Sequence, residues 1–210
     1  MRATRSDDMA VYGRQPLRNL FDDSPTPHIA HPPRTHHRHY YVATDGSFQQ
    51  PGGGLGVVIE TGEGERLDRL AVPDRVPDNN VAEYRALHLG LDVLAARVPA
   101  DARVGVLVDH DELAANVNTA TLRARQPDWP RRHPSIPEGS GHHWRGIRAR
   151  IRGFEELRAA RIESGQNPAH PLANTPGRYR HVDSEPSAAR PTEAHGEVPP
   201  PSRADRHASD

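Results

Sequence analysis

The run Val104–Val108 constrains the fold of this chain more than any other feature. Its sequence, Val-Gly-Val-Leu-Val, is apolar and shows no alternation with polar residues. Strands with this pattern are buried on both faces and occur in parallel sheets. Helices must then cover the sheet, so the chain is expected to be an α/β protein.

The sequence before this run has a different pattern. Three apolar, strand-like segments are joined by two short glycine-rich links, and such links between strands favour an antiparallel meander. The segments are residues 39–48, 55–60 and 66–72. The expected architecture is a mixed sheet, with the meander followed by parallel strands.

Helical segments alternate with the later strands. Pro77-Asp78-Asn79-Asn80 provides N-cap residues for a helix that runs to about Val98. Further helices are expected from Asp111, as the N-cap, to Leu122 and from His143 to about Leu157, with a short strand near 160–163. Asn167, as N-cap, and Pro168 should open a short last helix.

Composition places the folded part in the middle of the chain. The apolar fraction is only 34% and 21 of the 210 residues are proline, which is unusual for a wholly globular chain. The segments 1–37 and 176–210 have the composition of disordered extensions, apart from a possible short helix at 16–21. The domain is therefore expected to span 38–175.

Other compositional features narrow the function. The chain has no cysteine, so disulfides, thiolate metal sites and cysteine nucleophiles are excluded. No apolar run reaches the length of a membrane span, so a cytoplasmic protein is expected. The formal net charge of −1 says little about partners.

Three carboxylates stand at positions where ligands bind. In the first strand, alternation puts Asp45 on the same face as Tyr41 and Ala43, although the following Gly-Ser also suits a turn. Asp109 directly follows the buried strand, and ligands bind at such carboxyl ends. Glu83 lies on the same helix face as Leu87, which should face the sheet. The helix macrodipole favours an acid near the start of a helix but does not explain why this acid lies on the buried face.

These acids are expected to meet at one edge of the sheet. Clustered carboxylates repel one another unless they are protonated or bridged by cations. Oxygen ligands without sulfur suit Mg²⁺ or Mn²⁺, and a pair of such ions suits phosphoryl chemistry. Asp45 is therefore interpreted as a metal ligand.

At this point the sequence resembles type 1 ribonuclease H. The resemblance rests on three motifs in order, namely YVATDGSF with Asp45, the segment 78–87 (DNNVAEYRAL) with Glu83, and 106–109 (VLVD) with Asp109. It covers roughly residues 38–175 and implies an RNase H-like fold with a five-stranded mixed sheet flanked by helices. It also implies cleavage of the RNA strand in RNA–DNA hybrids with two divalent ions.

The fourth ligand position departs from the pattern of this family, which usually has an aspartate there. His170 occupies it here, and neutral imidazole can bind a divalent metal while shifting the preference toward Mn²⁺. The resemblance then implies that Asp45, Glu83, Asp109 and His170 form the catalytic and metal-binding set. The competing interpretation is that His170 is an ordinary helix-start residue in a decayed site.

The resemblance also suggests substrate contacts. Asn79 and Asn80 would contact the minor groove of the hybrid, where the RNA 2′-hydroxyl is read, and Gly46 and Ser47 would let backbone approach the RNA; helix capping and turn formation are the alternatives. Residues 121–161 contain ten arginines and four acids. They are equally consistent with contacts to the DNA strand and with a solvated helix face.

The expected function is that of a metal-dependent endonuclease that acts on RNA–DNA hybrids, and the protein is expected to be a monomer. Two alternatives stay open: a binding module of the same fold that does not cut, and a nuclease of the same fold that acts on another nucleic acid. Fold alone excludes neither.

Overall fold

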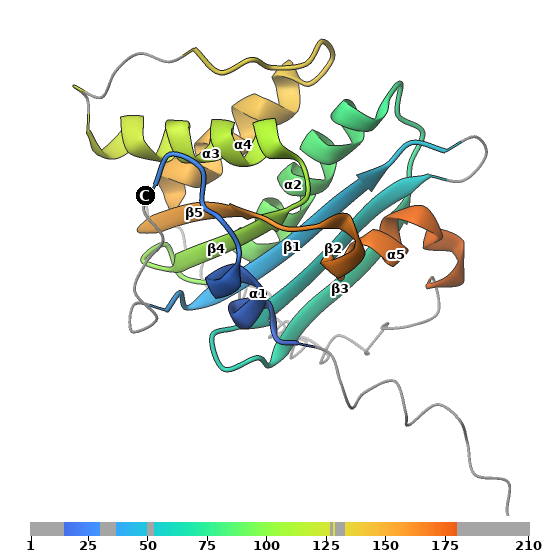
Figure 1. Cartoon of the computed structure of the whole chain (residues 1–210), viewed down its shortest axis with the longest axis horizontal. Coiled ribbons are helices and arrows are strands. Elements are labelled where there is room, and N and C mark those ends of the chain that lie inside the picture. The colour runs from blue at the N-terminus through green and yellow to red at the C-terminus, as the bar shows by residue number, and fades with distance from the viewer. Residues whose placement is uncertain (1–14, 30–36, 50–52, 127, 129–132, 180–210) are drawn as a thin grey trace, which may run out of the picture.

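The computed structural model describes residues 15–29, 37–49, 53–126, 128 and 133–179, and the strands within these ranges form one five-stranded sheet (Figure 1). The strand order is β3-β2-β1-β4-β5. The strands are β1 (Tyr40–Ser47), β2 (Gly54–Thr61), β3 (Arg66–Pro73), β4 (Arg103–Val108) and β5 (Glu156–Arg161).

The pairing of the strands confirms the expected mixed sheet. β1 pairs with β2, and β2 with β3, in antiparallel fashion, whereas β4 pairs in parallel with both β1 and β5. β4 is buried on both faces, as its apolar sequence predicts, because Val106 and Leu107 belong to different core clusters. The parallel pairing brings the carboxyl ends of β1 and β4 to the same side of the molecule.

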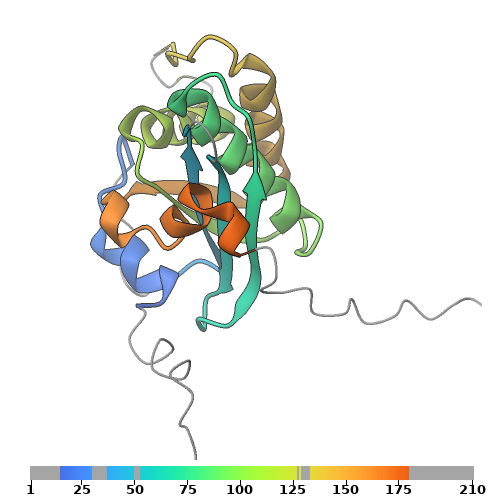
Figure 2. The same cartoon turned by 90° about the vertical axis from the view of Figure 1, so that its right-hand side faces the viewer.

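Helices cover both faces of the sheet. One face carries α2 (Asn79–Ala95), α3 (Asp111–Arg125) and α4 (Gly141–Gly153), and the other carries α1 (Leu17–Asp23) and α5 (His170–Asn174). The two layers are seen on either side of the sheet in Figure 2. Two short 3₁₀ turns, η2 (Ser164–Gln166) and η3 (Pro176–Arg178), flank α5. None of the helices in the described ranges has the length and apolar character needed to cross a membrane.

The amino-terminal boundary of the domain differs from the prediction. The composition of residues 1–37 predicted a disordered extension, but α1 packs on the sheet with Leu17 and Phe21 fully buried. The Phe21 ring meets the Tyr41 ring edge-on, with the centroids 5.5 Å apart. The buried Glu60 side chain accepts a hydrogen bond from the Leu17 backbone N–H at 2.9 Å, which caps α1 from β2. At the other boundary, Pro176 was predicted to begin the carboxyl-terminal extension, but it is buried at the start of η3. Residues 1–14, 30–36 and 180–210 lie outside the described residues.

Three local predictions also need correction. The helix expected to reach Leu157 ends at Gly153, and Leu157 lies in β5, paired with Val104. The N-cap of α3 is His110 rather than Asp111, because the His110 ring nitrogen Nδ1 accepts from the Leu113 N–H at 3.1 Å. The expected N-cap Asn167 precedes α5 by three residues, and Ala169 is the N-cap.

Candidate metal centre

Three of the predicted ligands lie together at the ends of β1 and β4. Asp45 near the end of β1, Asp109 directly after β4 and His170 at the start of α5 each offer one ligand atom, and these atoms lie within 4.8 Å of one another. Asp45 is buried, with 2% of its surface exposed, whereas Asp109 and His170 are partly exposed. The cluster is therefore closed on the side of β1 and open to solvent on the side of Asp109 and His170.

Glu83 joins this cluster from the opposite face of the sheet. The Asp78 carboxylate caps α2 by accepting from the Val81 N–H at 3.0 Å, which fixes where the helix begins. Glu83 then lies in the second turn, buried with 3% of its surface exposed, where it is repelled by Asp45 and Asp109. The acid on the leucine face of the predicted helix thus faces the other two acids.

Gly46 is the reason that β1 and α2 approach so closely. A Cβ atom at this position would lie 2.1 Å from the Ala82 carbonyl carbon and 2.4 Å from the Glu83 nitrogen. Real Cβ atoms do not approach backbone atoms at such distances, so any other residue would push the strand away from the helix. Gly46 therefore brings the carboxylates of Asp45 and Glu83 to one place.

Burial and mutual repulsion favour the protonated form of these acids when no cation is present. Burial, and next the charge of Asp109, raise the pKa of Asp45 from 3.8 to about 8. Burial, followed by repulsion from Asp45 and Asp109, also raises the pKa of Glu83 well above its ordinary value, although a hydrogen bond from the Gly46 backbone opposes this shift. Carboxylates in such a cluster are stable in ionised form only beside positive charge.

The ligand atoms themselves fit a divalent cation. Asp45 Oδ2, Glu83 Oε2 and His170 Nδ1 are buried without a hydrogen-bond partner in the described structure, and such orphaned atoms are rare in proteins. Carboxylate oxygens with a single imidazole form a donor set suited to Mg²⁺ or Mn²⁺. Residues of this chain therefore provide a fitting site for such ions.

The placement of α5 depends on two residues that sequence reasoning did not single out for this role. Gly56 pairs with Asp45 across the β1–β2 ladder, and a Cβ there would lie 2.2 Å from the Ala169 carbonyl oxygen. The buried Asn167 side chain donates to the Thr44 carbonyl at 2.9 Å and accepts from the Ala169 N–H at 3.0 Å. These contacts seat α5 directly on β2 and hold it to β1. His170 Nδ1 consequently lies 3.3 Å from Asp45 Oδ2.

Asn174 fixes the ring of His170 from one turn further along α5. Its side-chain oxygen accepts hydrogen bonds from the Ser47 hydroxyl at 2.6 Å and from the Gln49 amide at 3.0 Å. Its amide nitrogen then donates to His170 Nε2 at 2.7 Å, which leaves the proton of a neutral ring on Nδ1, facing Asp45. Metal binding through Nδ1 requires the reverse orientation of the Asn174 amide, with its oxygen accepting from Nε2–H.

The predicted substrate-contact residues near this cluster differ in their exposure to solvent. Asn79 and Asn80 are exposed at the start of α2, where Asn79 accepts from the Phe48 N–H at 3.3 Å and Asn80 hydrogen-bonds the His110 ring at 2.9 Å. Both stay available on the solvent side. The Ser47 side chain, by contrast, is buried and bonded to Asn174, so its direct role here is to orient the amide that holds His170.

Comparisons with known proteins place this chain next to ribonuclease H structures. No family model matches the chain, and no curated protein sequence matches it either. Similar solved structures include the N-terminal RNase H domain of rv2228c from Mycobacterium tuberculosis, with 22% identity and a TM-score of 0.49, which covers 64% of this chain and 95% of that chain.

Two further structures are similar to the same extent. RNase H1 from the halophilic archaeon Halobacterium salinarum is 19% identical with a TM-score of 0.46. LC11-RNase H1, solved in complex with an RNA/DNA hybrid, is 23% identical with a TM-score of 0.48. Each covers 64% of this chain and is itself covered to 94%.

Proposed function

We propose that this protein is a metal-dependent endonuclease that hydrolyses the RNA strand of RNA–DNA hybrids. The observation that carries the proposal is the convergence of Asp45, Glu83 and Asp109 with His170 at one end of the sheet. Two of these acids are buried and have ligand atoms without a partner among the described residues. Without a bound cation such a cluster lowers stability, because the acids must either repel one another or remain protonated.

The four residues share one part in this proposal. Asp45, at the centre of the cluster, would hold the divalent ions together with Glu83 and Asp109, and His170 would contribute the one nitrogen ligand. Divalent ions bound there supply Lewis-acid stabilisation of the phosphodiester charge and make water a better nucleophile. No side chain is assigned as a general base in this proposal, and the expected products carry a 3′-hydroxyl and a 5′-phosphate.

The substrate assignment rests on the motifs of the sequence and on the surface beside the cluster. The partly exposed Asp109 and His170 leave the centre open, and the exposed amides of Asn79 and Asn80 lie at the same end of α2 as Glu83. Such amides suit hydrogen bonds to a 2′-hydroxyl in a minor groove. The protein is proposed to bind the hybrid as a monomer.

A substrate panel tests this function. The full-length protein is incubated with end-labelled RNA–DNA hybrid, double-stranded RNA, single-stranded RNA and DNA, in Mg²⁺, in Mn²⁺ and in chelator. We expect cleavage only within the RNA of the hybrid, only with a divalent ion, and with 5′-phosphate products. Binding of the hybrid without cleavage in either metal would show a binding module instead, and preferential cleavage of another substrate would show a different nuclease.

A further inference from the structure

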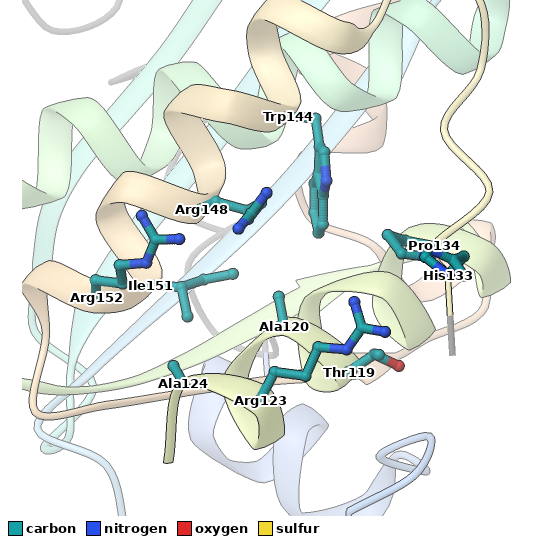
Figure 3. A pocket seen from close by; sticks show the side chains of 10 residues that line it. All are labelled: Thr119, Ala120, Arg123, Ala124, His133, Pro134, Trp144, Arg148, Ile151 and Arg152. Carbon is teal, nitrogen blue, oxygen red and sulfur yellow. The ribbon is translucent and has the colours of Figure 1, made fainter. Parts of the chain in front are cut away.

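A pocket of about 380 Å³ lies between α3 and α4, away from the carboxylate cluster (Figure 3). Its walls come from the second half of α3, from α4 and from the segment that precedes α4. The lining residues with polar or charged side chains include Thr119, Arg123, His133, Arg148 and Arg152. We refer to this space as the arginine pocket.

The positive charge of the arginine pocket is not compensated within the described part of the chain. Arg123, Arg148 and Arg152 line it together with no carboxylate, and none of the three makes a hydrogen bond or ion pair among the described residues. Neighbouring arginines behave differently. Arg150 pairs with Asp92 at 2.7 Å, and Arg125 lies 3.9 Å from Glu156.

Helix-end electrostatics explain only part of this arrangement. Arg123 and Arg152 lie in the last turns of their helices, where cations are favourable. Arg148 lies one turn before Arg152 on the same helix face, and like charges at this spacing repel each other. Figure 3 shows Arg123 from α3 and Arg148 from α4 extending into the space between the two helices. An anion bound between these arginines would offset the repulsion between Arg148 and Arg152.

The remainder of the pocket is apolar. Ala120 and Ala124 on α3 leave room between the helices, and Ile151 and Trp144 on α4 line the other side. The Trp144 indole is held in place by an edge-on contact with the Tyr84 ring, with the centroids 6.2 Å apart. Together with Pro134, these side chains give the pocket an apolar wall that a bare inorganic anion would not contact.

We propose that the arginine pocket binds a nucleoside phosphate unit, with the base against the apolar wall and the phosphate between the arginines. Guanidinium groups bind phosphate through paired, charge-assisted hydrogen bonds, and bases stack on aromatic and apolar side chains. The unit is either a free nucleotide or an unpaired nucleotide of a longer strand. The pocket does not share residues with the carboxylate cluster, so it does not depend on the proposed catalytic function.

A fluorescence titration tests this proposal. Trp129, the other tryptophan of the chain, is replaced by phenylalanine so that Trp144 alone reports, and chelator is present throughout. The probes are adenosine monophosphate, adenosine, inorganic phosphate and short oligoadenylate. We expect the monophosphate to change the Trp144 signal and to bind more tightly than adenosine or phosphate. Tighter binding of the oligoadenylate identifies a strand as the source, and equal affinities identify the free nucleotide.

Variants on the two helices separate this pocket from general attraction to arginines. Arg148→Gln should weaken monophosphate binding by about tenfold, since a hydrogen bond to a charged group is lost. Arg145→Gln, an exposed arginine of α4 outside the pocket, removes the same charge and should change the affinity little. Ala124→Leu should fill the pocket and abolish binding while it keeps every arginine.

Three results would overturn the proposal. One is no signal change with any nucleotide at millimolar concentration. Another is an equal loss of affinity in Arg148→Gln and Arg145→Gln, which would show diffuse electrostatic attraction. The third is that inorganic phosphate binds as tightly as the monophosphate, which would remove the base from the assignment. Circular dichroism spectra of the variants establish that each is folded.

Discussion

Burial of Asp45 beside two other acids makes the metal-free protein sensitive to pH. Its pKa is 3.8 in the unfolded reference and about 8 in the folded protein. Between these values the folded state holds a proton that the unfolded state has released. Since stability falls with rising pH wherever the folded state binds more protons, this group destabilises the metal-free fold progressively from about pH 4 to about pH 8.

Asp45→Asn should therefore stabilise the metal-free protein. The amide cannot ionise, so the difference in free energy of unfolding should grow across this pH window and reach on the order of a few kcal/mol near pH 8. Urea unfolding in chelator at pH 5 and at pH 8 measures it. Asp111→Asn is the matched control, because Asp111 is exposed on α3 and pairs with Arg161. Equal free energies of unfolding for wild type and Asp45→Asn at pH 8 would contradict the claim that burial and neighbouring acids disfavour the ionised Asp45 carboxylate.

Gly56 provides a second test at this scale. Gly56→Ala would place a methyl group against the Ala169 carbonyl and lift α5, together with His170, away from Asp45. We expect a loss of about 1–3 kcal/mol in stability and a clear loss of Mn²⁺ affinity. Gly165→Ala is the control, because nothing lies within 4 Å of a Cβ at that position. Calorimetric titration with Mn²⁺ and thermal unfolding measure both effects, and equal metal affinities in the two variants would show that α5 does not position a ligand.

His170 itself is tested by exchanging its donor atom. His170→Asp should raise hybrid cleavage with Mg²⁺, since a carboxylate is the harder ligand. His170→Ala should lower the rate by about tenfold or more with either ion, because one ligand is lost. Single-turnover rates with each metal distinguish these outcomes. Identical rates for wild type and His170→Ala would show that His170 is not a metal ligand and only occupies the start of the helix.

At the scale of the elements, α1 belongs to the domain although its surroundings in the sequence predicted an extension. The short apolar group of Leu17, Leu20 and Phe21 is too brief to indicate a stable helix by periodicity. Its stability comes from long-range contacts, namely the Tyr41 ring and the cap from Glu60. Such contacts leave no local signal in the sequence.

The contribution of α1 can be measured directly. Phe21→Ala should destabilise the protein by about 3–5 kcal/mol, since a fully buried ring is removed. Phe48→Ala is the matched control, because Phe48 is 40% exposed and its removal should change the free energy of unfolding by less than about 1 kcal/mol. Urea unfolding of both variants gives the comparison. An equally small effect of Phe21→Ala would show that α1 contributes nothing to the stability of the domain.

The order of strands and helices was predictable because it depends on local patterns. Gly-rich links indicated the meander, and the unbroken run in β4 indicated a parallel strand, as the pairing confirms. The end of α4 and the start of β5 were not predictable from helix-forming residues alone. Leu157 fits either element, and the pairing with Val104 in β4 decides between them.

At the scale of the whole molecule, the topology assembles the candidate centre from four separate elements. The positions of Asp45 and Asp109 follow from parallel pairing of β1 and β4, so the sequence allowed them to be placed at one edge. The close approaches at Gly46 and Gly56 involve α2 and α5 across the two faces of the sheet. They are properties of tertiary packing, so sequence patterns gave Gly46 only a role in substrate contact and did not single out Gly56.

The central claim is that the clustered acids hold divalent ions and cut the RNA of a hybrid, and one measurement tests it most directly. Single-turnover cleavage of a labelled RNA–DNA hybrid is compared for wild type, Asp45→Asn and the control Asp111→Asn at saturating Mg²⁺ and Mn²⁺. We predict metal-dependent cleavage by wild type and Asp111→Asn, and a rate for Asp45→Asn that is lower by at least about a thousandfold. Full activity of Asp45→Asn, or no cleavage by wild type with either ion, would contradict the account.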